Sequence, residues 1–98
     1  MTYEIRLREE AENDLAEASS WYQQQQIGLG HEFLDEVLSI LHTIQERPLS
    51  YPIIYRELHR AIVQRFPFCI FFKIHDGQII VFAVLHASRN PRTWRERT

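Results

Sequence analysis

The side chains that could carry chemistry lie in the second half of this 98-residue chain. The polar and aromatic candidates are His59, Arg60, Arg65, Lys73, His75, His86, Arg89, Arg92, Trp94 and Arg95. A ribonuclease that cleaves RNA through the 2′-hydroxyl needs a general base, a general acid and cations near the phosphate. Histidine suits the first two tasks because its pKa lies near neutrality, and arginine suits the third. The candidate catalytic set is His86, Arg60, Arg65 and Arg89, provided that their strands align.

Some aromatic and polar residues have a simpler interpretation. His86 ends an apolar run. Its role could therefore be purely structural, with hydrogen bonds formed at the end of a strand. Trp94 lies among arginines, where it could stack on an RNA base or pack the C-terminal tail onto the core. We expect Trp21 and Tyr22 to pack in the core or between helices. The single cysteine, Cys69, is expected to be a small buried hydrophobic residue.

Several common kinds of site do not fit the sequence. No spacing of cysteine and histidine fits a zinc site, and three glycines are too few for a phosphate-binding loop. The sequence also lacks a serine-nucleophile elbow. We therefore expect no metal and no cofactor.

The first half of the chain predicts a strand followed by a helical hairpin. Residues 3–7 alternate apolar and charged side chains, which is typical of a half-buried strand. One helix is predicted from about Glu9, and a second helix is ended by Pro48. Gly28 and Gly30 allow a tight reversal between them. Each helix carries an apolar stripe: Ala11, Leu15, Ala18 and Tyr22 in the first, and Phe33, Leu34, Val37, Leu38, Ile40, Leu41 and Ile44 in the second.

The second half predicts a loop over residues 49–56 and then three antiparallel strands. The strands are predicted over residues 58–66, 68–75 and 78–86, with a hairpin turn at Asp76–Gly77. The last strand is a continuous apolar run, so it should be well buried and should bring the following arginines to one rim of the molecule. The predicted fold is α+β: an N-terminal strand, a two-helix hairpin and a three-stranded antiparallel meander in one sheet (β-α-α-β-β-β), with a basic C-terminal tail.

Length and composition indicate one domain over residues 1–98. One cysteine rules out an internal disulfide and suits a reducing compartment. The longest apolar run is too short to span a bilayer, and the start of the chain lacks the apolar segment of a signal peptide. We therefore expect a cytoplasmic protein with no membrane partner.

The charges are divided unevenly along the chain. Residues 1–50 carry ten acidic and three basic side chains, whereas residues 51–98 carry three acidic and eight basic ones. The two signs could simply form two solvated faces. Alternatively, the basic half contacts an anion such as nucleic acid, or an acidic partner.

A series of short motifs resembles the RelE/ParE superfamily of bacterial type II toxins, also called plasmid stabilisation proteins. The motifs are Ala11, Glu12, Asn13, Asp14 and Leu15 with Ala18, Trp21 and Tyr22; Gly28, Leu29 and Gly30 with Glu32, Phe33 and Leu34; Ile44 with Pro48, Tyr51 and Pro52; Arg60 with Arg65, Phe66, Pro67 and Phe68; and Val84, Leu85 and His86 with Arg89, Pro91 and Trp94. Each motif is weak alone, but the ordered set spans nearly the whole chain. The resemblance implies the architecture predicted above and an oligomeric complex with a co-encoded antitoxin.

The resemblance allows two activities. RelE-like toxins cut mRNA in the ribosomal A site, using lysines and arginines with a late tyrosine or, in other branches, histidine and glutamate. ParE-like toxins poison DNA gyrase. Here Lys73 is the single lysine and no tyrosine follows Tyr55, whereas Arg60, Arg65 and His86 lie where a histidine-based nuclease would need them.

We favour the ParE-like interpretation. In it, the target or the antitoxin contacts Arg89, Arg92, Trp94 and Arg95. The alternatives are a ribosome-dependent mRNA endonuclease and a family member that binds a partner without toxicity.

Overall fold

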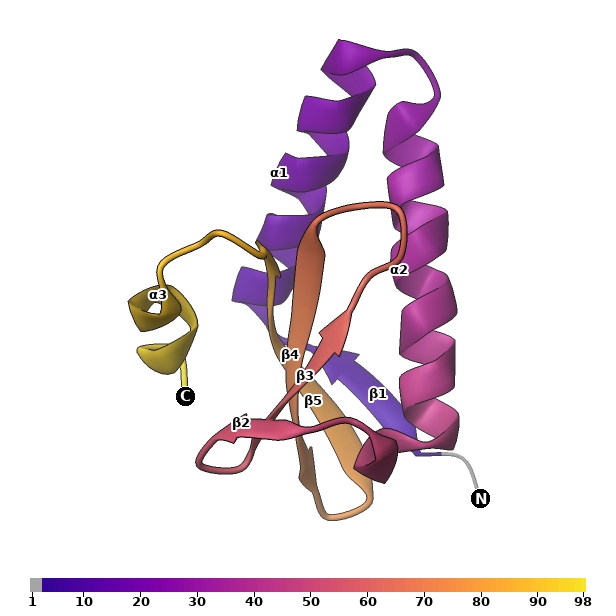
Figure 1. Ribbon diagram of the computed structural model, residues 1–98. Coiled ribbons are helices and arrows are strands. Elements are labelled where there is room, and N and C mark those ends of the chain that lie inside the picture. The colour runs from indigo at the N-terminus through magenta and orange to yellow at the C-terminus, as the bar shows by residue number, and fades with distance from the viewer. Residues whose placement is uncertain (1–2) are drawn as a thin grey trace.

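A five-stranded mixed sheet carries two long helices on one face and a short helix on the other (Figure 1). The computed structural model describes residues 3–98. The elements are β1 (Glu4–Leu7), α1 (Glu9–Gln25), α2 (Leu29–Glu46), the 3₁₀ helix η1 (Pro48–Ser50), β2 (Ile53–Tyr55), β3 (Leu58–Ile62), β4 (Phe68–His75), β5 (Gln78–His86) and α3 (Pro91–Arg95). The predicted α+β class is confirmed. No helix within residues 3–98 is long and apolar enough to cross a membrane.

The strands are ordered β1-β5-β4-β3-β2 across the sheet. β1 runs parallel to β5, with Ile5 opposite Ile79, and the other neighbouring strands are antiparallel. Parallel neighbours need a long connection, and here α1, α2 and the strands β2 to β4 provide it. β5 is therefore paired on both sides along its first half.

A bulge interrupts the pairing of β4 with β5. Phe71 and Phe72 are consecutive in β4, but their partners in β5, Ala83 and Val81, are separated by Phe82. Side chains alternate between the two faces of a strand, so one extra residue moves every later side chain to the opposite face. The bulge therefore decides which face receives the last residue of β5.

The loop predicted over residues 49–56 is corrected by the structure. It contains η1 and the short strand β2, which pairs with β3 and forms one edge of the sheet. β2 is only three residues long and directly follows Pro52, so sequence alternation alone could not identify a strand here. The strand predicted over residues 58–66 is also shorter and ends at Ile62, because a turn follows in which Arg65 has a φ of 70°.

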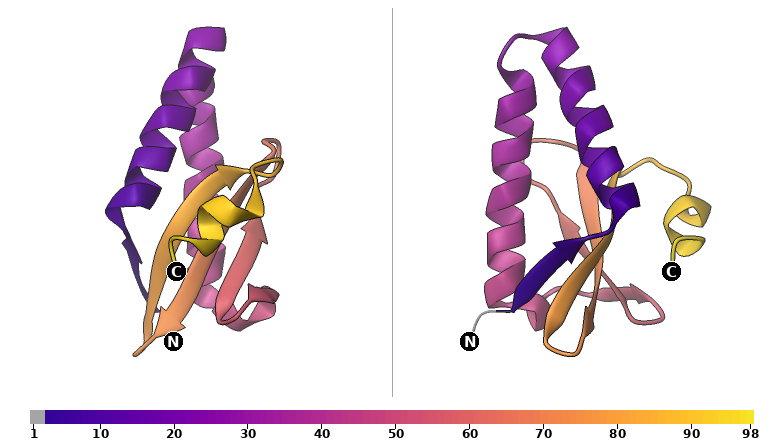
Figure 2. Two further views of the ribbon diagram at one scale, coloured as in Figure 1. Left: turned by 90° about the vertical axis from the view of Figure 1, so that its left-hand side faces the viewer. Right: turned by 180° about the vertical axis from the view of Figure 1, so that it is seen from behind.

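The basic tail forms a short helix. α3 begins with Pro91, whose fixed φ suits the first position of a helix. The side chain of Asn90 caps it by accepting a hydrogen bond from the backbone N–H of Arg92 at 2.9 Å. Figure 2 shows α3 apart from the two long helices.

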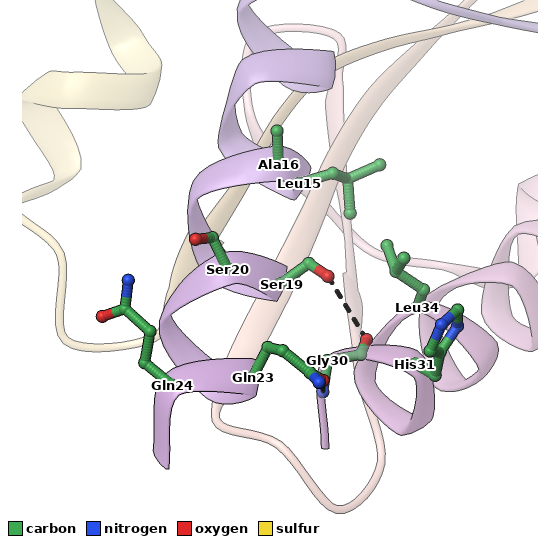
Figure 3. Close-up of a pocket in the computed structure, with 9 residues that line it drawn as sticks. All are labelled: Leu15, Ala16, Ser19, Ser20, Gln23, Gln24, Gly30, His31 and Leu34. Atoms are coloured by element: carbon green, nitrogen blue, oxygen red, sulfur yellow. Dashed lines mark hydrogen bonds between the residues drawn. The ribbon is translucent and has the colours of Figure 1, made fainter. Parts of the chain in front are cut away.

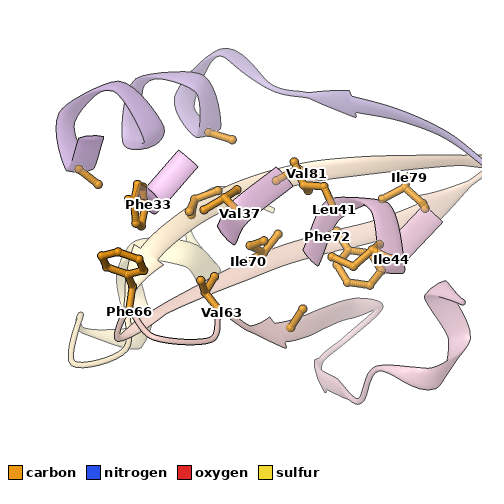
Figure 4. Packing of buried hydrophobic residues seen from close by; sticks show 14 residues of the cluster. Phe33, Val37, Leu41, Ile44, Val63, Phe66, Ile70, Phe72, Ile79 and Val81 are labelled. Atoms are coloured by element: carbon orange, nitrogen blue, oxygen red, sulfur yellow. The ribbon is translucent and has the colours of Figure 1, made fainter. Parts of the chain in front are cut away.

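The apolar stripe of α2 packs on the sheet (Figure 4). Phe33, Val37 and Ile44 are buried at helical spacing in the same cluster as Ile79 and Val81 of β5. Two expectations about packing were wrong, because Leu38 and Trp21 are 62% and 56% exposed. Leu38 follows Val37, and Trp21 precedes Tyr22. Consecutive residues of a helix point in different directions, so the neighbour of a core-facing residue can point to solvent.

The helical hairpin is tightened by close approach of its two helices (Figure 3). A Cβ atom on Gly30 would lie 2.6 Å from the carbonyl oxygen of Ser19, so only glycine fits there without movement of the backbone. The side-chain oxygen of Gln23 accepts hydrogen bonds from the backbone N–H groups of Gly28 and Gly30, which satisfies donors at the start of α2.

We predict that Ile44→Ala lowers the free energy of unfolding by about 2–4 kcal/mol, because a buried cavity adds to the lost transfer free energy. Leu38→Ala, on the exposed side of the same helix, should change it by less than about 0.5 kcal/mol. Urea denaturation of both variants measures the difference. A loss below about 0.5 kcal/mol for Ile44→Ala would contradict the assigned packing of α2.

Candidate functional site

The carboxylate of Asp14 fixes the C-terminal segment to α1 and β5. β1 ends at Leu7, so the later part of β5 has no strand on that side. Asp14 accepts a hydrogen bond there from the backbone N–H of Val84 at 2.9 Å. The guanidinium of Arg97 binds both oxygens of the same carboxylate and also donates to the carbonyl of Phe82. The hydrogen bond that Arg97 donates to the carboxylate of Asp14 raises the pKa of Arg97, so this arginine stays charged.

α3 contributes to a surface of arginines and aromatic rings on the second face of the sheet. Trp94 stacks on Phe71 with 5.0 Å between ring centroids, so it packs the tail onto the core. The guanidinium of Arg95 lies 5.2 Å from the ring centroid of Tyr55, and that of Arg56 lies at the same distance from the same ring. Cation–π attraction thus holds two arginines in place. We call Tyr55, Arg56, Trp94 and Arg95 the arginine–aromatic surface.

His86 lies on the other face of the sheet, beside α1. Its ring is 5.4 Å from that of Phe68 and lines a hollow with Ala18 and Trp21. The Nδ1 atom accepts a hydrogen bond from the backbone N–H of Ser88 at 3.1 Å. One ring nitrogen is therefore occupied by the chain itself.

Arg60 lies on the face that His86 does not occupy. It is exposed in β3 opposite Phe71, whose side chain belongs to the cluster on the second face. The strands β3 and β5 are separated by β4, so their backbones lie about 10 Å apart. The sheet itself stands between the two side chains.

Arg65 is held by α2. Its guanidinium lies 2.7 Å from a carboxylate oxygen of Glu32 and 3.4 Å from one of Glu36. The hydrogen bond to Glu32 is the main reason that the pKa of Arg65 is raised. The structure therefore does not bring Arg60, Arg65 and His86 together around one phosphate position.

The remaining arginines of the tail point in different directions. Arg89 lines the hollow beside His86, and its backbone N–H bonds to the carbonyl of His86 at 2.9 Å. Arg92 is exposed and lies 3.8 Å from Glu96. Arg95 belongs to the arginine–aromatic surface. The tail thus presents its cations around α3 rather than in one row.

The three remaining candidates, His59, Lys73 and His75, each contact other residues of the chain. His59 is buried, stacks on Phe72 and bonds through Nδ1 to the carbonyl oxygen of Tyr51 at 2.8 Å. Lys73 lies 5.2 Å from the ring centroid of Phe82. His75 is at the exposed β4–β5 hairpin, 3.3 Å from Asp76.

The described residues offer neither a grouped set of metal ligands nor a reactive thiol. Among residues 3–98 no three histidine, cysteine, aspartate or glutamate side chains are grouped so that they could hold a metal ion. Cys69 is buried, and desolvation raises the pKa of its thiol although the charge of Arg60 opposes this effect. A buried thiol with a raised pKa is a poor nucleophile.

The sequence model described as "ParE toxin of type II toxin-antitoxin system, parDE" matches residues 5–91. The chain belongs to the ParE toxin family. The resemblance found in the sequence is therefore confirmed.

Two solved structures share the fold. A chain of the chromosomal ParDE toxin–antitoxin system from P. aeruginosa is 12% identical with a TM-score of 0.78, covering 87% of this chain and 96% of that chain. A chain of the toxin–antitoxin complex RelBE2 from Mycobacterium tuberculosis is 17% identical with a TM-score of 0.65, covering 88% of this chain and 99% of that chain. No curated protein matches the sequence.

Several residues that shape the site of this ParE family member carry no recognisable signal in the sequence. Tyr55 and Arg56 lie in the segment predicted as a loop over residues 49–56, so the contact of Tyr55 with α3 has no signal in the sequence. Asp14 and Arg97 are 83 positions apart, and only their opposite charges could have indicated a pair. Asp14 does lie within the motif that carries the resemblance.

We predict that Asp14→Asn lowers the free energy of unfolding by about 2–4 kcal/mol. The side chains of Asp14 and Arg97 are only 10% and 18% exposed, and removing one partner leaves the other charge buried and uncompensated. Arg92→Ala is the control, because its ion pair with Glu96 is exposed and should contribute less than about 0.5 kcal/mol. Urea denaturation with tryptophan fluorescence measures both. Equal stability of the two variants would contradict the role of Asp14.

Proposed function

We propose that this chain is the toxin of a type II toxin–antitoxin pair and that it inhibits growth by binding DNA gyrase. The observation that supports binding over RNA cleavage is the separation of His86, Arg60 and Arg65. His86 lies on the helix-covered face, Arg60 lies on the second face, and Arg65 pairs with two carboxylates of α2. General acid–base catalysis requires its groups within hydrogen-bond reach of one substrate, and this arrangement does not provide it.

The arginines of the tail fit a docking role. Arg95 and Arg56 share the ring of Tyr55, and α3 is anchored to the body of the protein through Arg97. Side chains that are already held in place lose little conformational entropy when a partner binds. The family resemblance supplies gyrase as the target. Arg89, Arg92 and Arg95 are the proposed contact residues, and Trp94, which is buried, supports Arg95 from within the fold.

An antitoxin is the second proposed partner. The similar structures from P. aeruginosa and M. tuberculosis come from toxin–antitoxin systems. The sheet has a short edge strand, β2, and several apolar side chains are exposed, among them Ile53 and Ile62. Exposed apolar side chains and sheet edges are surfaces that partner proteins commonly cover.

A ribosome-dependent mRNA endonuclease is the second candidate function. It is favoured by the presence of Arg60 on the same face as the arginine–aromatic surface, where cations and rings could hold an RNA strand. Such an enzyme would use neither His86 nor Arg65 at that face. A family member that binds its partner without toxicity is the remaining alternative.

We predict that His86→Gln leaves growth inhibition nearly unchanged. Arg89→Glu, Arg92→Glu or Arg95→Glu should weaken gyrase inhibition about tenfold or more, because charge reversal opposes docking. Arg47→Glu, an exposed arginine at the end of α2, is the charge-matched control. Growth after induction, gyrase-linked DNA breaks and mapped transcript ends are the measurements, after circular dichroism has shown that each variant folds.

Loss of toxicity in a folded His86→Gln variant, with cleaved transcripts restored to full length, would contradict this proposal. General acid–base catalysis typically contributes a factor of 10²–10⁴ to the rate, so replacing a catalytic histidine would abolish most of the activity. Transcript cleavage that persists in His86→Gln but disappears in Arg60→Ala would support the endonuclease at the second face.

We also predict that the product of the adjacent antitoxin gene co-purifies with this chain and relieves its toxicity. The interface should bury roughly 1,500 Å² or more, which is usual for a stable complex. Co-expression followed by size-exclusion chromatography tests the association. A neighbouring protein that neither binds nor protects would exclude the toxin–antitoxin interpretation.

A further inference from the structure

A hollow lies between α1, the β3–β4 turn and the end of β5, on the face of the sheet that carries the long helices. Its lining is mainly apolar and aromatic: Ala18, Trp21, Tyr22, Pro67, Phe68 and His86. Its volume is about 400 Å³, enough for one large side chain and part of its neighbours. None of these residues belongs to the arginine–aromatic surface.

Trp21 forms one wall of the hollow and is 56% exposed. It meets Tyr22 edge to face with 5.1 Å between ring centroids, and Tyr22 in turn contacts Phe33, Phe66 and Phe68. A large exposed ring that rests on a rigid aromatic cluster is typical of the anchors that dominate binding energy at protein interfaces. Trp21 belongs to neither buried cluster, so its ring is accessible to a partner.

His86 presents a hydrogen-bond donor at the hollow. A backbone N–H can only donate, so the bond from Ser88 makes Nδ1 an acceptor. In the neutral imidazole the proton must then be on Nε2, which makes this atom a donor. Nε2 of the ring next to Trp21 can therefore donate a hydrogen bond to a carbonyl or carboxylate oxygen.

Charges at the rim favour a protein as the occupant. Asp14, Glu17 and Arg89 line an adjoining hollow, which shares Trp21, Phe68 and His86 with the first one. The carboxylate of Asp14 is already neutralised by Arg97, which leaves Glu17 as the negative group next to Trp21. Carboxylates repel the phosphates of nucleic acid but complement a lysine or arginine of a protein segment.

We infer that this hollow is a docking site for a segment of the antitoxin, with Trp21 as its anchor and His86 as a hydrogen-bond donor. The segment places one large apolar side chain on Trp21 and Phe68, gives a backbone or side-chain oxygen to Nε2 of His86, and carries a cation that pairs with Glu17. This inference rests on the proposed function, because it needs an antitoxin. It assigns His86 to recognition and the arginine–aromatic surface to the target.

The first test observes the hollow directly. The sequence contains two tryptophans, so Trp94→Phe leaves Trp21 as the only tryptophan reporter. When the purified product of the adjacent gene is added, and if that protein lacks tryptophan or has its own replaced by phenylalanine, the emission of Trp21 should shift to shorter wavelength. Iodide quenching of this emission should fall several-fold. An emission spectrum that stays unchanged in a formed complex would overturn the inference.

The second test measures the dissociation constant of the same complex for matched variants. Trp21→Ala should weaken it about 30-fold, as expected for an anchor residue. His86→Leu should weaken it about fivefold, because it removes a hydrogen bond, whereas His86→Gln should stay within about twofold since the amide can donate from a similar position. Leu38→Ala, an equally exposed apolar residue on the outer side of α2, is the control and should have no effect.

The possible results separate this inference from the proposed function. Wild-type affinity for Trp21→Ala and His86→Leu would overturn the docking site but leave the toxin–antitoxin pair intact. No binding by the wild-type chain would overturn both. Loss of gyrase inhibition by Trp21→Ala with unchanged antitoxin binding would assign the hollow to the target and would also overturn the inference.

Discussion

The carboxylate of Asp14 joins three parts of the molecule that the sheet alone would leave unconnected. It supplies an acceptor for Val84 where β5 has no neighbouring strand, and it binds the guanidinium that ends the C-terminal segment. Without this acceptor the N–H of Val84 would lose its partner, and α3 would be held mainly by the stacking of Trp94 on Phe71. The position of the tail arginines and the shape of the hollow beside β5 both depend on this one group.

The bulge at Phe82 determines which candidate residues share a face of the sheet. Without the extra residue, simple alternation from Val81 would place His86 on the same face as the arginine–aromatic surface, where it could meet Arg60. With it, His86 faces α1. One inserted residue therefore separates groups that a catalytic mechanism would need together, and this is why the geometry fits recognition better than proton transfer.

Much of the fold could be predicted from local sequence patterns. The apolar stripe of α2, the stop at Pro48 and the turn at Asp76–Gly77 are each determined by neighbouring residues, and the structure confirms them. The site could not be predicted in the same way. It depends on a bulge, on a contact between Tyr55 and α3, and on an ion pair between distant residues, and none of these leaves a periodic signal. The exposure of Trp21 was missed because hydrophobicity alone does not separate a core ring from an exposed one.

The sheet also lies between the hollow and the arginine–aromatic surface, so filling the hollow does not cover that surface. A ligand that fills only the hollow beside Trp21 leaves Arg56 and Arg95 uncovered on the opposite face. The inhibitor and the target could then bind to the toxin at the same time without a steric clash. On the proposed function, an inhibitor that fills the hollow would also have to extend past the rim of the sheet as far as α3 to cover these arginines. The length of the inhibitor segment, more than its affinity for the hollow, would then determine whether the toxin is neutralised.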